Sequence, residues 1–238
     1  MPEYRVSVMK GMYIFLAFMV YFFLLLLTLL PFLKYTFSIN PALYWFITGY
    51  ALFVPLFVCA VALVRLEGNS APKEIVKALH LKSFSKKDWA YSIAGLLLVF
   101  IFTGMIFGVS ALLNKYFGLR PLSTMPWFME FKPFQGAEKL LLLAWLPMFF
   151  FNIAGEELLW RGYIQARLSG NHTWALCSLL WLVFHLPFGL DLMIMVVPAI
   201  IIIPYVFHKT RNSLTGIFIH GLYNGPVFVL LSLGLMKQ

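Results

Sequence analysis

The sequence predicts an all-α fold, a polytopic transmembrane helical bundle of about seven spans. Of the 238 residues, 62% are hydrophobic and only 11% are charged, and the mean hydropathy is +0.87. A soluble domain carries about 25% charged residues. The apolar runs are also about 20 residues long, which is enough to cross the hydrocarbon core of a bilayer. Cys59 and Cys177 both lie in apolar runs and predict no disulfide.

Prolines, glycines and charges divide the apolar sequence into spans. The expected ranges are about 11–33, 42–64, 90–113, 139–167, 172–187, 190–207 and 213–235. The fourth range is too long for one straight crossing at about 1.5 Å per residue. We therefore expect its last turns to leave the membrane as a cytosolic extension. In the polar stretch before the third span, Ile75, Val76 and Leu79 have the spacing of a short amphipathic surface helix.

The motifs are confined to one part of the chain. Residues 1–134 contain the first spans and a surface loop but no motif, whereas residues 135–238 contain every candidate site residue. We expect one structural domain overall, with residues 135–238 forming a catalytic membrane core and a polar cavity lying among the C-terminal spans.

The basic residues predict topology rather than nucleic-acid binding. The net charge of +9 would suggest a nucleic-acid partner in a soluble protein. Here the basic residues lie in short loops between spans, where they act as topology signals and contact anionic lipid. The N-terminus, loop 65–88 and turn 208–212 are rich in Lys and Arg, so we place them and the opening of the site on the cytoplasmic side. The uncharged run 11–33 exceeds a signal peptide's apolar region and predicts a retained first span.

Few ionisable side chains lie inside the predicted spans, and each needs an explanation. They are Glu156, Glu157, Arg161, His185 and His220. A charge at the bilayer centre costs roughly 2.5–3.5 kcal/mol on insertion scales, and such residues usually have partners and mark function. At about 1.5 Å per residue, Glu156, His185, His220 and Asn224 lie roughly 16, 20, 10 and 16 Å inside the cytosolic boundary. Three helices therefore bring polar groups to a similar level.

The spacing of these residues predicts which of them share a face of a helix. Glu157 and Arg161 are four residues apart, which predicts an ion pair. Glu156 points about 100° away from Glu157. The same side of the helix as Glu156 carries Asn152, Trp160 and Tyr163. His220 and Asn224 share one face of the last span. Three glycines would let a neighbouring helix approach that span closely, namely Gly216, Gly221 and Gly225.

This set of residue types can hydrolyse an amide without a covalent nucleophile. A carboxylate beside an imidazole, in a cavity that excludes bulk water, can deprotonate a held water molecule. A second histidine and an asparagine can donate hydrogen bonds to an oxyanion. Other protease mechanisms fit worse, because the sequence has no His-Glu-x-x-His pair, no Gly-x-Ser-x-Gly elbow and no aspartate pair inside the spans.

A metal site is the alternative that these residues leave open. Glu156, His185 and His220 could bind zinc as a His₂Glu site. Asn224 would be an unusual neighbour there, and Glu157, the remaining candidate base, would already be engaged by Arg161. We therefore favour a mechanism without a metal or other cofactor.

Three short motifs, one in each of three spans, carry a resemblance to a known family. They are Glu156-Glu157-x-x-x-Arg161, Trp181-x-x-x-His185 and His220-x-x-x-Asn224. Over residues 135–235 the pattern resembles the CAAX protease and bacteriocin-processing family of intramembrane glutamate proteases. This family includes the Ras-converting CAAX prenyl endopeptidases and many bacterial Abi-type proteins. The second motif departs from the family, which usually has Phe where this chain has Trp181.

The resemblance implies a role for each matching residue. Glu156 would be the general base, and His185 would be its partner in positioning water. His220 and Asn224 would form the oxyanion site.

By the same resemblance, Glu157 and Arg161 would hold the site in shape. It also implies an intramembrane endopeptidase of a bacterial plasma membrane, acting on a prenylated CAAX-like tail, a peptide precursor or a membrane protein. Two other functions stay open. One is a non-catalytic scaffold, immunity or regulatory protein of the same fold, and the other is a transporter that uses Glu and His as a proton relay.

Overall fold

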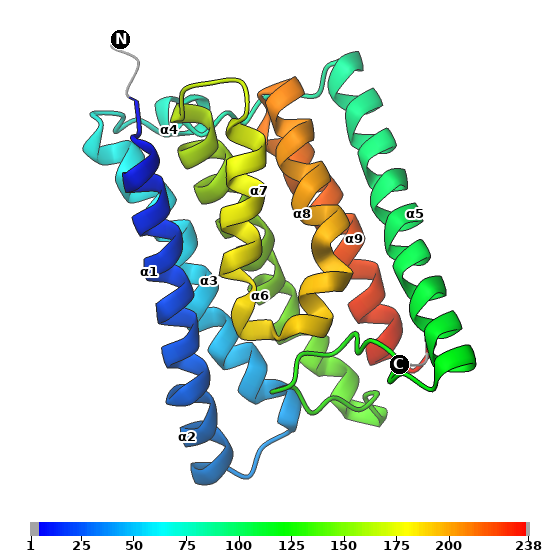
Figure 1. Ribbon diagram of the computed structural model, residues 1–238. Coiled ribbons are helices and arrows are strands. Elements are labelled where there is room, and N and C mark those ends of the chain that lie inside the picture. Colours follow the sequence, from blue (N-terminus) through cyan, green and yellow to red (C-terminus); the bar gives the residue numbers. More distant parts are fainter. Residues whose placement is uncertain (1–4, 237–238) are drawn as a thin grey trace.

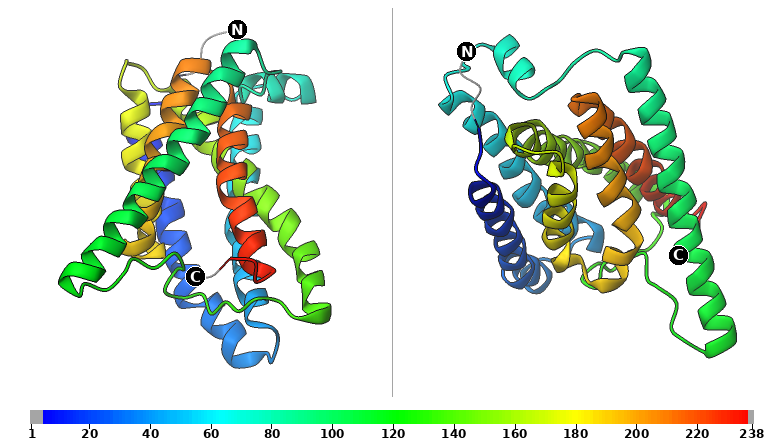
Figure 2. Two further views of the ribbon diagram at one scale, coloured as in Figure 1. Left: turned by 90° about the vertical axis from the view of Figure 1, so that its right-hand side faces the viewer. Right: turned by 45° about the horizontal axis from the view of Figure 1, so that its top comes forward.

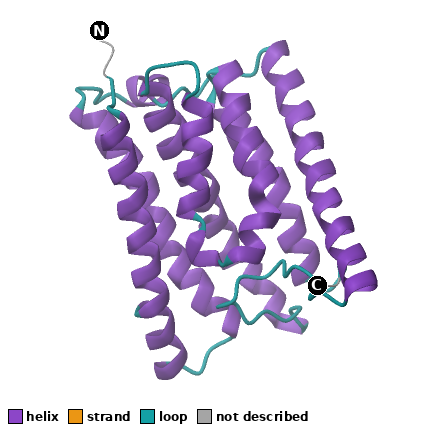
Figure 3. Ribbon diagram, viewed as in Figure 1, coloured by secondary structure: helices purple, strands orange, loops and turns teal. Residues whose placement is uncertain are grey.

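Long apolar helices run side by side through the whole molecule (Figure 1). The computed structural model describes residues 5–236, and within this range the chain forms helices and loops but no strand (Figure 3). The helices are α1 (Val8–Leu27), α2 (Leu29–Thr36), α3 (Pro41–Leu66), α4 (Pro72–Ala78), α5 (Lys86–Phe117), η1 (Gly136–Leu140), α6 (Leu141–Glu156), η2 (Glu157–Gln165), α7 (Thr173–Phe184), η3 (Leu186–Phe188), α8 (Leu190–Thr210) and α9 (Ser213–Ser232).

The predicted all-α, polytopic membrane bundle is confirmed. Within the described residues six stretches are long and apolar enough to cross a membrane: Val8–Thr36, Pro41–Leu66, Lys86–Phe117, Gly136–Gln165, Leu190–Thr210 and Ser213–Ser232. The expected fifth span corresponds to a shorter apolar stretch, Thr173–Phe188. Figure 1 shows that α7 and η3 turn back well before the far ends of α2 and α6. The end of α7 therefore lies inside the bundle.

The basic segments lie at one end of the bundle, as the sequence predicts. The start of α1, the segment around α4 and the turn between α8 and α9 are at the top of Figure 1, whereas the last turn of α9 lies toward the bottom. Contacts agree with this view, because the backbone N–H of Val6 donates to the carbonyl of Arg167 and that of Ser213 donates to the carbonyl of His80.

Several helices have a polar N-cap residue. The side chains of Ser7, Asn40 and Asn212 each accept a hydrogen bond from a backbone N–H in the first turn of the helix that follows. Ser85 and Asp88 form a reciprocal capping box at the start of α5. Such caps satisfy N–H groups that have no partner within the helix, and so they fix where each span starts.

The last turns of the fourth span, which we expect to leave the membrane, are enclosed by protein. Every residue of η2 is buried, and η2 packs against α3, α7, α8 and α9. Two features accommodate the length. The helix α6 runs obliquely across the bundle (Figure 2), and η2 is wound as a π-helix, whose i→i+5 turns hold more residues than α-helical turns.

Candidate active site

Five of the six predicted site residues are buried side by side in the interior. The exposed fractions are 3% for Glu156, 0% for Glu157 and Arg161, 8% for His185 and 4% for His220. They come from the α6–η2 helix, the end of α7 and the middle of α9. Trp181, which is 2% exposed, lies among them.

Both oxygens of Glu156 accept a hydrogen bond. The Nδ2 of Asn152, one helical turn earlier, donates to Oε1 at 3.0 Å, and the indole Nε1 of Trp181 donates to Oε2 at 2.6 Å. These bonds fix the direction of the carboxylate. A carboxylate has about four acceptor positions, so Glu156 keeps the capacity to accept a hydrogen bond from a water molecule.

The carboxylate of Glu157 joins two helices. Its Oε2 lies 3.3 Å from the Nε of Arg161, which confirms the predicted i,i+4 ion pair. Its Oε1 lies 3.0 Å from the Nδ1 of His220 on α9. Gly216 makes this approach possible, because a Cβ atom at that position would overlap the Glu157 carboxylate. The link between Glu157 and His220 does not follow from the sequence pattern.

The guanidinium of Arg161 is held by its charge partner and by an aromatic face. Its central carbon lies 3.5 Å from the centroid of the Trp181 ring, a cation–π arrangement. Within the described residues the Nη1 and Nη2 atoms of Arg161 have no hydrogen-bond partner. A buried charge in this state depends strongly on the partner that remains, and here that partner is Glu157.

The Nδ1 atom anchors each histidine ring. In His185, Nδ1 lies 2.8 Å from the carbonyl oxygen of Trp181. A carbonyl only accepts, so this nitrogen carries the proton and Nε2 has the lone pair. In His220, Nδ1 faces Glu157, and an ionised carboxylate likewise only accepts. Both rings therefore keep Nε2 for another partner.

Trp181 is the residue whose importance the sequence analysis missed. Its ring centroid lies 5.4 Å from those of His185 and His220, in addition to its contacts with Glu156 and Arg161. The sequence did hold a signal: a buried indole usually finds a partner for its N–H, and the usual Phe of the family's motif has no such group.

Asn224 is more exposed than the other five predicted site residues. It lies on α9, one helical turn beyond His220, and is half-buried. Within the described part of the chain, no hydrogen bond joins its side chain to the other predicted site residues.

A zinc ion at this site could be bound by only some of the atoms of Glu156, His185 and His220. Among residues 5–236, no three His, Cys, Asp or Glu side chains form a group that could hold a metal ion. Because Nδ1 of both rings is engaged, a His₂Glu site would have to use Nε2 of His185, Nε2 of His220 and a carboxylate oxygen of Glu156. That alternative stays a prediction.

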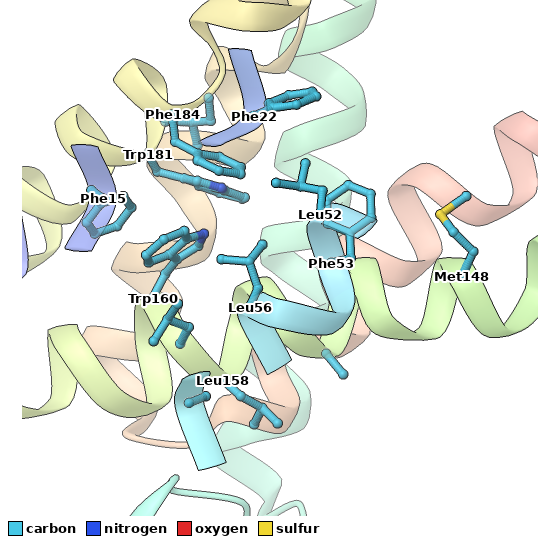
Figure 4. Packing of buried hydrophobic residues seen from close by; sticks show 14 of the residues in the cluster. Phe15, Phe22, Leu52, Phe53, Leu56, Met148, Leu158, Trp160, Trp181 and Phe184 are labelled. Atoms are coloured by element: carbon cyan, nitrogen blue, oxygen red, sulfur yellow. The ribbon is translucent and has the colours of Figure 1, made fainter. Parts of the chain in front are cut away.

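Aromatic and aliphatic side chains enclose the cluster on one side. Trp160 stacks on Phe15, with ring centroids 3.9 Å apart, and contacts the edge of Phe184. Figure 4 shows Trp160 and Trp181 close to Leu56 of α3. This packing excludes water from one side of the polar groups, where unscreened charges interact more strongly.

The fold and the site define an integral membrane protein with a buried carboxylate–imidazole cluster among its C-terminal helices. Residues 138–225 match the family model described as Rce1-like, type II CAAX prenyl endopeptidase Rce1-like. The match confirms the resemblance for this segment, which includes all six predicted site residues. The family is a protease family that also has non-catalytic members. Neither the curated proteins nor the solved structures compared with the chain gave a match.

Proposed function

We propose that this protein is an intramembrane endopeptidase in which Glu156 activates water. The observation that carries the proposal is the carboxylate of Glu156, buried and aimed by Asn152 and Trp181, with the rings of His185 and His220 both against the same indole. The match of residues 138–225 to a family of prenyl endopeptidases supports it independently.

The first chemical step uses Glu156 and His185. A water molecule between them would donate one hydrogen bond to the carboxylate and one to the Nε2 lone pair of His185. As Glu156 takes the first proton, the oxygen of the water attacks the carbonyl carbon of the peptide bond. A tetrahedral intermediate forms, and general-base help of this kind contributes about 10²–10⁴-fold to the rate.

His220 and Asn224 would stabilise the oxyanion, and Glu156 would protonate the leaving amine. When His220 carries both protons, Nδ1 donates to Glu157 and Nε2 is available to donate to the oxyanion. The amide of Asn224, one turn further along α9, would supply a second donor. Collapse of the intermediate breaks the C–N bond, and Glu156 returns its proton to the amine.

Glu157 and Arg161 take a supporting role in this proposal. They are fully buried, and Glu157 contacts the Nδ1 side of His220 rather than the side that would face a substrate. Their ion pair fixes the ring of His220, and the guanidinium of Arg161 packs on one face of Trp181. A fixed constellation needs no reorganisation during the reaction.

The substrate that we propose is a peptide or protein with a prenylated CAAX-like tail, because the matching family model is described by that activity. A peptide precursor or the stem of a membrane protein would use the same chemistry. We further propose that the chain lies in a bacterial plasma membrane with its basic end in the cytoplasm, in line with the distribution of Lys and Arg. Reporter fusions to the C-terminus, expected outside, test this orientation.

Glu156→Gln tests the proposed chemistry. The amide keeps the shape of the side chain but is not a base, so cleavage of a fluorogenic prenylated CAAX-like peptide by the purified full chain should fall by at least about 10²-fold. Glu130→Gln is the matched control, since Glu130 is exposed and pairs with Lys34 at the surface. Cleavage retained by a folded Glu156→Gln variant would refute the assignment and favour a non-catalytic role.

A further inference from the structure

A basic cavity opens at the end of the bundle where α3, η2 and α8 finish. Its volume is about 850 Å³. Its walls carry five basic and two acidic residues, a formal excess of three positive charges: Arg5, Lys73, Lys77, Arg167, Arg211, Glu67 and Glu74. None of the proposed catalytic or supporting residues lines it, so the cavity is separate from the site around Glu156.

The two carboxylates in the wall are already engaged by the protein. Glu67 accepts from Arg167 in a two-pronged pair, with Oε2 2.7 Å from Nη2 and Oε1 3.0 Å from Nε. Glu74 accepts from the backbone N–H groups of Ser70 and Ala71. With both carboxylates counted, the lining residues keep a formal excess of three positive charges.

Two wall residues hold a backbone conformation that disfavours side chains. His80 has φ 55° and Arg211 has φ 51°, and they are the two non-glycine residues with positive φ among those described. Glycine adopts this left-handed region without steric conflict. The turn alone would favour glycine at both positions, so the side chains present there add local backbone strain.

The environment of His80 shows that the wall is electropositive. Burial, together with the charges of Arg211, Lys82 and Arg167, lowers the pKa of His80 from 6.5 to about 4. Within the described residues its buried Nδ1 atom has no hydrogen-bond partner. An anion in the cavity would offset the cations that act on this ring.

We propose that this cavity binds a phosphate group, supplied by the headgroup of an anionic phospholipid. Guanidinium and ammonium groups are the usual protein ligands of phosphate. The cavity lies at the ends of the candidate spans Pro41–Leu66 and Gly136–Gln165, which is the level of lipid headgroups. Beside it, α4 packs Ile75 and Ala78 toward the core while Lys73 and Lys77 are exposed.

The experiment compares the full chain in phosphatidylcholine nanodiscs with and without phosphatidylglycerol. We expect phosphatidylglycerol to raise the midpoint of thermal unfolding, and native mass spectrometry to retain it in preference to phosphatidylcholine. The double variant Lys73→Gln, Lys77→Gln should weaken retention by about five-fold for each lysine, the contribution of one basic residue near an anionic membrane surface.

Arg211→Gly separates the ligand site from the turn. Glycine suits φ 51°, so the fold should be kept while retention of the anionic lipid falls. The matched control is Lys86→Gln, Lys87→Gln, which removes two charges at the start of α5, outside the cavity. An equal loss of retention in this control would overturn the proposal, as would equal retention of the two lipids by the unmodified chain.

A second arm identifies the source of the phosphate. Inorganic phosphate is added to the chain in phosphatidylcholine nanodiscs. If it alone raises the unfolding midpoint, and Lys73→Gln, Lys77→Gln removes that rise, the phosphate site is supported but a soluble ligand replaces the lipid headgroup. No effect of inorganic phosphate, with preferential retention of phosphatidylglycerol, supports the lipid. Neither result depends on whether the chain cleaves peptides.

Discussion

The indole N–H of Trp181 donates a 2.6 Å hydrogen bond to Oε2 of Glu156. The family usually has Phe at this position, so the one departure of this chain from the motifs places an additional donor on the proposed base. The carbonyl of the same residue accepts from Nδ1 of His185. One residue thus orients the carboxylate through its side chain and the imidazole through its backbone.

Trp181→Phe should lower kcat and leave KM nearly unchanged. Phe keeps an aromatic ring against His185 and His220 but removes the donor to Glu156. We expect kcat to fall about ten-fold, which corresponds to about 1.4 kcal/mol of activation free energy. Steady-state kinetics with the prenylated peptide provide the measurement.

Trp160→Phe is the control for that change. The Nε1 atom of Trp160 is buried and, within the described residues, has no hydrogen-bond partner. The same loss of an indole N–H should therefore leave kcat nearly unaffected. Equal losses of kcat in the two variants would show that indole size, and not the hydrogen bond to Glu156, matters.

Gly216→Ala should disrupt the junction between Glu157 and His220. The added methyl group would overlap the Glu157 carboxylate, and overpacking of this kind typically destabilises by about 1–3 kcal/mol. We expect a lower unfolding midpoint and a loss of peptidase activity. Gly104→Ala on α5 is the control, because nothing lies within 4 Å of its Cβ position; a similar loss in Gly104→Ala would argue against the steric explanation.

Arg161→Met should destabilise the fold strongly. The change leaves the fully buried carboxylate of Glu157 with His220 as its remaining partner, and breaking a buried ion pair costs about 3–5 kcal/mol. Arg161→Lys should recover part of this loss, since lysine restores the charge but not the planar contact with Trp181. Chemical unfolding in detergent measures both. Arg120→Met, which breaks the pair between the exposed Arg120 and the half-buried Asp191, should have little effect.

Acid should weaken the fold through His80. Its pKa is about 4 in the folded protein and 6.5 when unperturbed, so the unfolded chain binds the proton more readily. The contribution of neutral His80 is complete above pH 6.5 and is lost as the pH falls from 6.5 toward 4. The cations that act on the ring are Arg211, Lys82 and Arg167.

His80→Asn tests this pH dependence, because asparagine tolerates the left-handed backbone but does not titrate in this range. The unfolding midpoint of the variant should fall less between pH 6.5 and pH 4 than that of the unmodified chain. Parallel curves for the two proteins would contradict the assignment to His80.

Composition and motif spacing predicted much of this molecule. Apolar runs of about 20 residues define the spans, and a separation of four residues is enough to pair Glu157 with Arg161. Spacing along one helix says nothing about how neighbouring helices are rotated, however. The contact between Glu157 and His220 and the central place of Trp181 depend on that rotation, so they emerge only from the packed bundle.

The winding of the fourth span could not be predicted for a related reason. A residue count assumes α-helical rise, whereas the buried residues Glu157–Gln165 adopt wider turns. Winding of this kind depends on the fit to neighbouring helices, and the intrinsic preferences of the residues are too small to specify it.

The π-helical winding of η2 makes the position of Arg161 sensitive to insertions and deletions. Losing one residue from this segment would let it rewind as an ordinary α-helix and still end near the same place. A deletion between Glu157 and Arg161 would change their angular offset around the helix axis and displace the guanidinium from its place on the face of Trp181. The number of residues in η2 is therefore under the same structural constraint as their identity.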